Sequence, residues 1–173
     1  MEEKYLDDIL PKLAKIQLFE DFDPTNENDK KILTDVYNSI SLKKFSKGQI
    51  IIEEGKTGDE FFILNTGSVH ISRKTPDGDN IALADLNAGM NIFFGETALV
   101  SDDPRSATVT AIDDCTCLVL SSKKFHSICK NEPLLGYRVL SVLARRMAKT
   151  IRETNRDKAT LYLALYNEIA GAL

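Results

Sequence analysis

One carboxylate and one guanidinium stand close together in the middle of the chain, and their types are suited to binding chemistry. Glu96 follows Gly95, and Arg105 follows Pro104 after a short apolar stretch. A guanidinium makes two-pronged, charge-assisted hydrogen bonds to a phosphate. A carboxylate would repel a phosphate, but it accepts hydrogen bonds from a sugar hydroxyl. Together the two side chains indicate a pocket for a small sugar phosphate.

The residues between these two predict how such a pocket is built. Ala98 and Leu99 suit one helical turn after Gly95, and the first N–H groups of a helical turn point toward an anion. Most Glu and Arg residues at this spacing are solvated or form a weak ion pair. The wider string favours the pocket, because residues 94–109 read Phe-Gly-Glu-Thr-Ala-Leu-Val-Ser-Asp-Asp-Pro-Arg-Ser-Ala-Thr-Val.

This string closely resembles the phosphate-binding cassette of the cyclic-nucleotide-binding domain family, which includes bacterial catabolite activators and regulatory subunits of protein kinase A. The runs 45–55 and 59–69 also resemble the opening strands of that family's jelly roll. The resemblance therefore covers residues 18–151. Within the cassette, the matching positions are Phe94, Gly95, Glu96, Ala98, Leu99, Pro104, Arg105, Ala107, Thr108 and Val109.

The resemblance implies a set of ligand-binding residues and a role for most of them. Glu96 accepts the ribose 2′-hydroxyl, Gly95 lets the backbone approach the sugar, and Arg105 pairs with the cyclic phosphate. Ser106 and Ala107 offer backbone N–H groups to the same phosphate, and the Ser106 hydroxyl adds a further bond. The ligand-binding residues that we expect are Gly95, Glu96, Thr97, Arg105, Ser106 and Ala107.

The base is less well determined than the sugar phosphate. In this family a Thr or Ser directly after the arginine contacts the guanine of cGMP, whereas Ala there accompanies cAMP, so Ser106 is compatible with both; we expect cAMP. Candidates to line the base cleft, or to be ordinary core, are Leu64, Val69, Ile71 and Leu83. Candidates to cover the base from the long C-terminal helix are Arg152, Asn155 and Arg156.

Two features depart from the family pattern. Family members run from a glycine into the cassette as Gly-x-x-Phe-Gly-Glu, whereas the stretch from Gly89 to Phe94 is longer by two residues. The extra residues predict a bulge in the strand that leads into the pocket. Thr97 replaces the usual aliphatic residue after the glutamate, which predicts a small loss of packing.

Short β-rich runs alternate with glycine turns in the middle of the chain, as in a compact antiparallel roll. With the resemblance, this predicts an α+β fold: an antiparallel β-roll (double-stranded jelly roll) flanked by N-terminal and C-terminal helices. The segments that we expect are N-terminal helices at 1–40, the β-roll at 41–121 with its cassette at 94–109, and C-terminal helices at 122–173. The predicted strands are Leu42–Phe45, Ile50–Glu53, Glu60–Asn65, Ser68–Lys74, Asn80–Asp85, Ala107–Ile112 and Cys117–Ser121.

Apolar residues recur every three or four positions on both sides of the roll, which indicates amphipathic helices. Thr25 or Asn26 is expected to cap a helix that ends near Ile40. Ser122 is expected to cap a short helix, and a longer helix starts near Leu134. The resemblance implies that the N-terminal helices move with the C-terminal helices when ligand binds.

The long C-terminal helix carries an interrupted heptad pattern. Its apolar positions recur every seven residues, but Thr154 and Lys158 break the seam. Its last turns are apolar around much of their circumference, and such a patch is sticky when exposed. Three partners for these turns remain open: the chain's own domain, a second copy in a homodimer, or another protein.

Composition restricts the function classes. A chain of 173 residues suffices for one domain with a substantial core. The net charge of −4 argues against nucleic-acid binding by the whole domain. There is no membrane-length apolar run, and Met1–Lys4 lacks a signal-peptide pattern. We therefore expect a cytoplasmic protein with no membrane partner.

Catalytic and metal chemistry are poorly supported. Two His and three Cys are too few, at these spacings, for a metal site, and Cys115 and Cys117 are expected to be small buried hydrophobes on one strand face. No Ser-His-Asp or Cys-His set is present. We expect no catalytic residue, no metal and no cofactor, only the ligand cAMP or cGMP.

These observations predict a sensor, not an enzyme, in which ligand binding moves the C-terminal helices and so acts on a protein partner or a fused output domain. The alternatives are a truncated cyclic-nucleotide-dependent transcription regulator and an excised regulatory domain of a signalling enzyme or channel. Residues 1–173 contain no basic recognition helix, which disfavours nucleic-acid binding by this chain.

Overall fold

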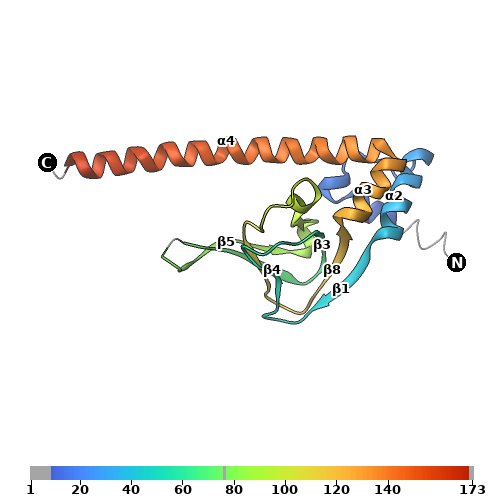
Figure 1. Cartoon of the computed structure of the whole chain (residues 1–173), viewed down its shortest axis with the longest axis horizontal. Coiled ribbons are helices and arrows are strands. Elements are labelled where there is room, and N and C mark those ends of the chain that lie inside the picture. The colour runs from blue at the N-terminus through green and yellow to red at the C-terminus, as the bar shows by residue number, and fades with distance from the viewer. Residues whose placement is uncertain (1–8, 76, 172–173) are drawn as a thin grey trace.

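A computed structural model describes residues 9–75 and 77–171, and it shows a β-roll lying beside one long helix (Figure 1). Residues 9–14 are helical, while residues 1–8 of the expected N-terminal segment lie outside the described part. The helices that follow are η1 (Gln17–Phe19), α2 (Glu27–Ser39), η2 (Ala88–Met90), η3 (Glu96–Leu99), α3 (Ser122–Asn131) and α4 (Pro133–Gly171). The strands are β1 (Ser41–Phe45), β2 (Ile50–Ile52), β3 (Glu60–Thr66), β4 (Ser68–Lys74), β5 (Asn80–Asn87), β6 (Phe93–Phe94), β7 (Thr108–Ala111) and β8 (Cys115–Ser121).

The strands form two four-stranded antiparallel sheets, in the orders β1-β8-β3-β6 and β2-β7-β4-β5. The predicted α+β class, a β-roll flanked by helices, is confirmed. All the predicted strands are present, with ends that differ by two residues at most. Strand β6 is an addition that the sequence did not predict, since Phe93 and Phe94 are too few to show an alternating pattern.

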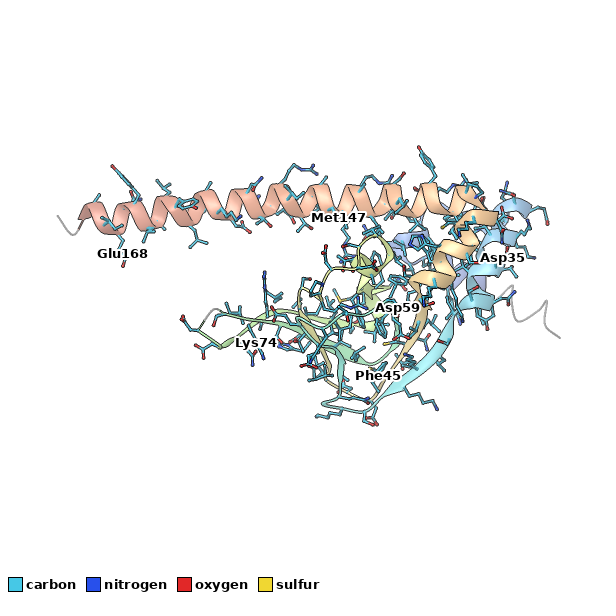
Figure 2. All side chains as sticks on the ribbon, in the orientation of Figure 1. Asp35, Phe45, Asp59, Lys74, Met147 and Glu168 are labelled. Atoms are coloured by element: carbon cyan, nitrogen blue, oxygen red, sulfur yellow. The ribbon has the colours of Figure 1, made fainter. Side chains whose placement is uncertain are left out.

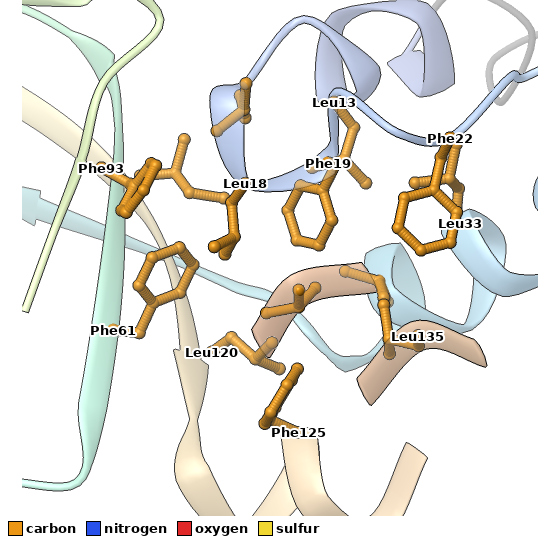
Figure 3. Packing of buried hydrophobic residues seen from close by; sticks show 14 of the residues in the cluster. Leu13, Leu18, Phe19, Phe22, Leu33, Phe61, Phe93, Leu120, Phe125 and Leu135 are labelled. Carbon is orange, nitrogen blue, oxygen red and sulfur yellow. The ribbon is translucent and has the colours of Figure 1, made fainter. Parts of the chain in front are cut away.

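Two apolar clusters hold the fold together. One lies inside the roll and contains Phe62, Phe94 and Val119. The other lies between the roll and the helices, where Phe61 and Leu120 of the roll meet the helical residues (Figure 3). The aromatic rings of Phe61 and Phe93 lie 5.6 Å apart between centroids. The second cluster therefore fixes the helices against the strand that leads into the cassette.

The two helices that flank the roll begin with side-chain caps. Asn26 caps α2 as expected, since its Oδ1 accepts bonds from the N–H groups of Asn28 and Asp29. The expected cap at Ser122 is wrong, because Ser121 caps α3 by accepting a bond from the Lys124 N–H. Ser121 is the last residue with extended backbone, and this is the position from which a hydroxyl reaches the first free N–H groups.

The N-terminal segment is joined to the start of α4 by a partly buried ion pair. The Asp29 residue is only 6% exposed, and both of its carboxylate oxygens lie 2.8 Å from Nη1 of Arg138. One oxygen also accepts a bond from the Asp23 N–H at 2.9 Å. The guanidinium lies 4.7 Å from the centroid of the Phe22 ring. The N-terminal segment and the first turns of α4 thus form one packed unit.

The long helix α4 is anchored at only one end. Leu135, Val139 and Leu143 are buried in the cluster between helices and roll. From Met147 to residue 170 every residue is exposed, and the C-terminal part of α4 around Glu168 extends away from the roll (Figure 2). No described helix is long and apolar enough to cross a membrane.

Removing the Leu135 side chain should test this anchoring. Leu135 is fully buried, so Leu135→Ala leaves a cavity and should lower the free energy of unfolding by about 2–5 kcal/mol. Tyr137, which is 73% exposed on the same helix, is the control, and Tyr137→Ala should change it by less than about 0.5 kcal/mol. Urea denaturation measures both, and equal losses would contradict the packing described.

Candidate functional site

The second residue of the cassette is a glycine that no other residue can replace without strain. Gly95 joins β6 to η3 with a left-handed backbone, φ = 74°. A Cβ on Gly95 would lie 2.9 Å from Nη1 of Arg105 and 2.9 Å from Cδ1 of Ile52. Both the backbone angle and the space therefore require glycine. The helical turn expected after it is present as η3, a 3₁₀ turn.

Arg105 is the most constrained residue of the site, being 8% exposed. Its Nη1 donates to the Gly95 carbonyl at 3.0 Å, and its Nη2 donates to the Glu60 carbonyl at 2.6 Å. Its backbone N–H and carbonyl bond to Lys56 and Gly55 respectively, at 2.8 and 2.9 Å. The loop before β3 and the cassette are therefore joined through this one residue.

The environment of the Arg105 guanidinium is acidic on several sides. Burial lowers its pKa, and the carboxylates of Glu60, Asp59 and Glu96 act in the opposite direction. The charge of Glu96 thus acts on Arg105, although less than burial and the charges of Glu60 and Asp59 do. An arginine carries five N–H donors, so two bonds to carbonyls leave donors for an anion.

Glu96 is paired with the long helix. Its Oε1 lies 3.8 Å from Nη2 of Arg146, and the Glu96 side chain is 20% exposed. The Arg146 guanidinium also lies 4.5 Å from the centroid of the Phe93 ring, within the range of a cation–π contact. The sequence did not indicate Arg146, because the local pattern of α4 gives no reason to select one of its many basic residues.

The other cassette residues divide into a packed and an exposed group. Phe94, Ala98 and Leu99 are buried, as expected of residues that pack the cassette. Thr97 and Ser106 are exposed, and Ala107 is half-buried. The structure thus leaves these polar residues on the accessible side of the turn.

The two extra residues before the cassette do not bulge a strand. Strand β6 pairs with β3 at Phe62 and Ile63 without a shift in register. The extra length is taken up earlier, by η2 and by Asn91, whose backbone is left-handed at φ = 51°. Asn tolerates this conformation better than most residues. The predicted bulge is therefore wrong, and the cassette is presented on a regular strand pair.

Of the four candidates to line the base cleft, two are buried in the core and two are accessible. Leu64 and Val69 belong to the core inside the roll, so they pack the fold. Ile71 is half-buried, and Leu83 is 56% exposed beside a register shift between β4 and β5. Only these last two are placed so that a ligand could reach them.

The residues of α4 that were expected to cover the base are not the ones that line the cavity beside the roll. Arg152, Asn155 and Arg156 are exposed, and none of them lines a described cavity. The cavity between α4 and the roll, about 530 Å³, is lined instead by Arg146 and Thr150. A second hollow of about 370 Å³ contains Arg105. Neither of these two cavities is lined by both Glu96 and Arg105.

The cysteines are structural. Cys115 and Cys117 are both buried on β8, as expected, and burial raises the pKa of Cys117 to about 12. A thiol with that pKa stays protonated and is a poor nucleophile. Within residues 9–75 and 77–171 no group of His, Cys, Asp and Glu side chains could hold a metal ion.

Fold and site together define a class, a β-roll whose arginine-centred turn lies beside a long helix. A family model described as "Cyclic nucleotide-binding domain" matches residues 42–132, more than half of the chain. The chain therefore belongs to the cyclic nucleotide-binding domain family, and its resemblance to that family is confirmed.

Individual relatives support this assignment. The cAMP-dependent protein kinase regulatory subunit of Dictyostelium discoideum is 34% identical over 104 residues, which is 55% of this chain and 31% of the relative. A CRP-like cAMP-activated global transcriptional regulator of Mycobacterium tuberculosis is 26% identical over 159 residues, 92% of this chain and 64% of the relative. The chain thus spans less than two thirds of either relative.

A solved structure shows a similar fold. The crystal structure of a cyclic nucleotide-binding domain from Methylobacillus flagellatus matches with a TM-score of 0.68 and 27% identity, over 89% of this chain and 82% of that one. The match extends the similarity beyond the cassette to most of the chain.

Two glycines with similar backbones offer a matched test of the Arg105 contact. A Cβ on Gly55 (φ = 79°) would meet no atom within 4 Å, whereas a Cβ on Gly95 (φ = 74°) would lie 2.9 Å from Arg105. Gly55→Ala should cost only the backbone strain, about 1–2 kcal/mol of unfolding free energy. Gly95→Ala should cost about 1–3 kcal/mol more, through displacement of the guanidinium. Urea denaturation measures the difference, and equal costs would contradict the crowding.

Proposed function

We propose that this chain is a cyclic-nucleotide sensor that prefers cAMP to cGMP and transmits ligand binding to α4. The observation that carries the proposal is the contact between Glu96 of the cassette and Arg146 of α4. It connects the residue expected to bind the ribose with the helix expected to move.

The cassette supplies groups for each part of a cyclic ribose phosphate. The Arg105 donors that are not bonded to carbonyls take the phosphate, with the backbone N–H groups of Ser106 and Ala107 beside them. Glu96 accepts the 2′-hydroxyl, and Gly95 keeps that face of the sugar free of a side chain. Thr97, exposed beside Glu96, is the remaining ligand-facing residue.

The coupling follows from competition for Glu96. At 3.8 Å the ion pair with Arg146 is long, and such pairs contribute little when accessible to water. A ribose hydroxyl on Glu96 changes this contact, and Arg146 carries the change to α4. The nucleotide must bind one arrangement of α4 better than the other, and this difference is the free energy available for signalling.

The preference for cAMP rests on Ser106 and on the description of one relative. Ser106 is exposed, so its hydroxyl can reach either base. The regulator that aligns with 92% of the chain is described as cAMP-activated.

The site is proposed to bind its ligand without converting it and without a metal or cofactor. In this proposal Glu96 and Arg105 act as binding groups, one for the sugar and one for the phosphate. The output depends on a domain fused to this one or on a separate protein, which would be a transcription regulator, a kinase or a channel. The matched kinase regulatory subunit and the matched transcriptional regulator are both longer than this chain.

Calorimetric titration tests the binding site. The wild-type protein should bind cAMP more tightly than cGMP and leave cAMP unhydrolysed. Glu96→Ala should weaken cAMP binding by at least about tenfold, because a hydrogen bond to a charged group is lost. Arg105→Ala should abolish measurable binding, with unfolding measured separately because Arg105 also supports the fold.

Glu168→Ala, on the exposed end of α4, is the control. Tighter cGMP binding would overturn the preference, and unchanged affinity in the Arg105 variant would overturn the site.

We also propose that α4 pairs with α4 of a second copy. Met147, Ile151 and Leu165 are 37%, 60% and 54% exposed on one helix face, an arrangement that water disfavours. The positions recur with the heptad spacing of a coiled coil.

A charge placed on this face should separate the two copies. Ile151→Asp puts an unpaired carboxylate into the pairing face and should shift the protein from dimer to monomer in sedimentation equilibrium. Thr160→Asp, on the opposite side of the exposed helix, adds the same charge and should leave the dimer intact. A wild-type monomer at every concentration would rule out the pairing.

A further inference from the structure

A line of basic side chains runs along one face of α4, away from its apolar face. Arg145, Lys149, Arg152 and Arg156 follow one another at steps of four, three and four residues, which places them on one side of the helix. The side chains of Arg145, Lys149 and Arg156 are 57%, 71% and 79% exposed, and Arg152 is exposed as well. We call these four residues the basic stripe.

The net charge around the basic stripe is opposite in sign to the net charge of the whole chain. Residues 145–158 contain six basic and two acidic residues, a net charge of +4, in a chain whose net charge is −4. Neighbouring like charges at three- and four-residue steps destabilise a helix. The like charges of the stripe therefore carry a cost in the stability of α4.

The charges of the stripe are only partly neutralised within the described residues. Arg145 lies 3.1 Å from Asp21 and 3.7 Å from Glu20, while Lys149 and Arg156 lie 3.9 Å from the carboxylates of Glu153 and Asp157. These contacts are exposed, and exposed ion pairs are weak. Arg152 makes no ion pair with any residue in the part of the chain that the structure describes.

A cavity adjoins the stripe at its N-terminal end. Arg145 and Lys149 line the space of about 530 Å³ between α4 and the roll, together with Lys15 from the N-terminal segment. Apolar side chains form part of its wall, and Met90 of η2 is 54% exposed there. The remaining apolar wall residues are Leu86, Ile92, Phe93 and Val142.

We propose that the basic stripe and this cavity form a docking surface for an acidic polypeptide segment. The stripe spans about 16 Å, the length of three helical turns, so a short acidic helix can match its charges. An apolar side chain of the segment enters the cavity beside Met90. The stripe lies about 140° around α4 from Met147 and Ile151, so docking is compatible with pairing of two α4 helices.

The same observations disfavour nucleic acid as the partner. The rest of the chain is acidic, and nucleic-acid surfaces are as a rule strongly basic. An apolar-walled cavity fits a peptide side chain, since peptide interfaces combine apolar anchors with a charged rim.

Fluorescence anisotropy with defined probes tests the proposal on the full chain. The main probe is a labelled helical peptide of about 12 residues, rich in Glu and carrying one central Leu. A second peptide replaces that Leu with Gln, and a third probe is a duplex DNA. We expect the Glu-rich peptide to bind, more weakly as salt rises, and the Gln form to bind less tightly.

Charge reversal identifies the surface. Arg152→Glu with Arg156→Glu should weaken peptide binding by about tenfold or more. Lys44→Glu with Lys47→Glu, on exposed residues of the roll, makes the same change in net charge and should leave the affinity within about twofold. Circular dichroism confirms that α4 remains helical in both variants.

Three results would overturn the proposal: no binding of the Glu-rich peptide, equal effects of the two charge reversals, or tighter binding of DNA than of the peptide through the stripe. The last result would assign the stripe to nucleic acid. None of these outcomes depends on cyclic-nucleotide binding, so the docking surface stands or fails separately from the sensor function.

Discussion

The buried guanidinium of Arg105 is the interaction on which the site depends. A buried charge is costly unless it is hydrogen-bonded, and here the carbonyls of Glu60 and Gly95 accept from it. Its donors reach these carbonyls only because glycines stand on both sides, since a Cβ on Gly58 would lie 3.0 Å from Nη2 and one on Gly95 2.9 Å from Nη1. One side chain thus holds the loop before β3 against the cassette and keeps its remaining donors for an anion.

From the cassette a short series of contacts leads to the helices. Glu96 meets Arg146, the Arg146 guanidinium lies over Phe93, and Phe93 belongs to the cluster that packs α4 against the roll. At its start α4 is joined to the N-terminal segment through Arg138 and Asp29. These contacts join Glu96 to a unit that is packed together, while the exposed part of α4 presents separate apolar and basic faces.

The sequence predicted the parts of this arrangement that are local. Alternating and helical periods gave the strands and helices, and the cassette string gave Gly95, Glu96 and Arg105. It did not predict Arg146, since a contact across fifty residues leaves no pattern in the sequence near it. Strand β6 was too short to recognise, and the extra residues before it formed a turn ending at Asn91 and left the strand regular.

The most direct test of the central claim combines a change in the ligand with a change in the protein. Calorimetry compares cAMP with 2′-deoxy-cAMP, first on the wild-type protein and then on Glu96→Ala. If the ribose hydroxyl rests on Glu96 with the phosphate at Arg105, removing the hydroxyl should weaken binding to the wild type by at least about tenfold and should have little further effect in the variant. Equal losses in both proteins would contradict the account, because the hydroxyl would then bind elsewhere.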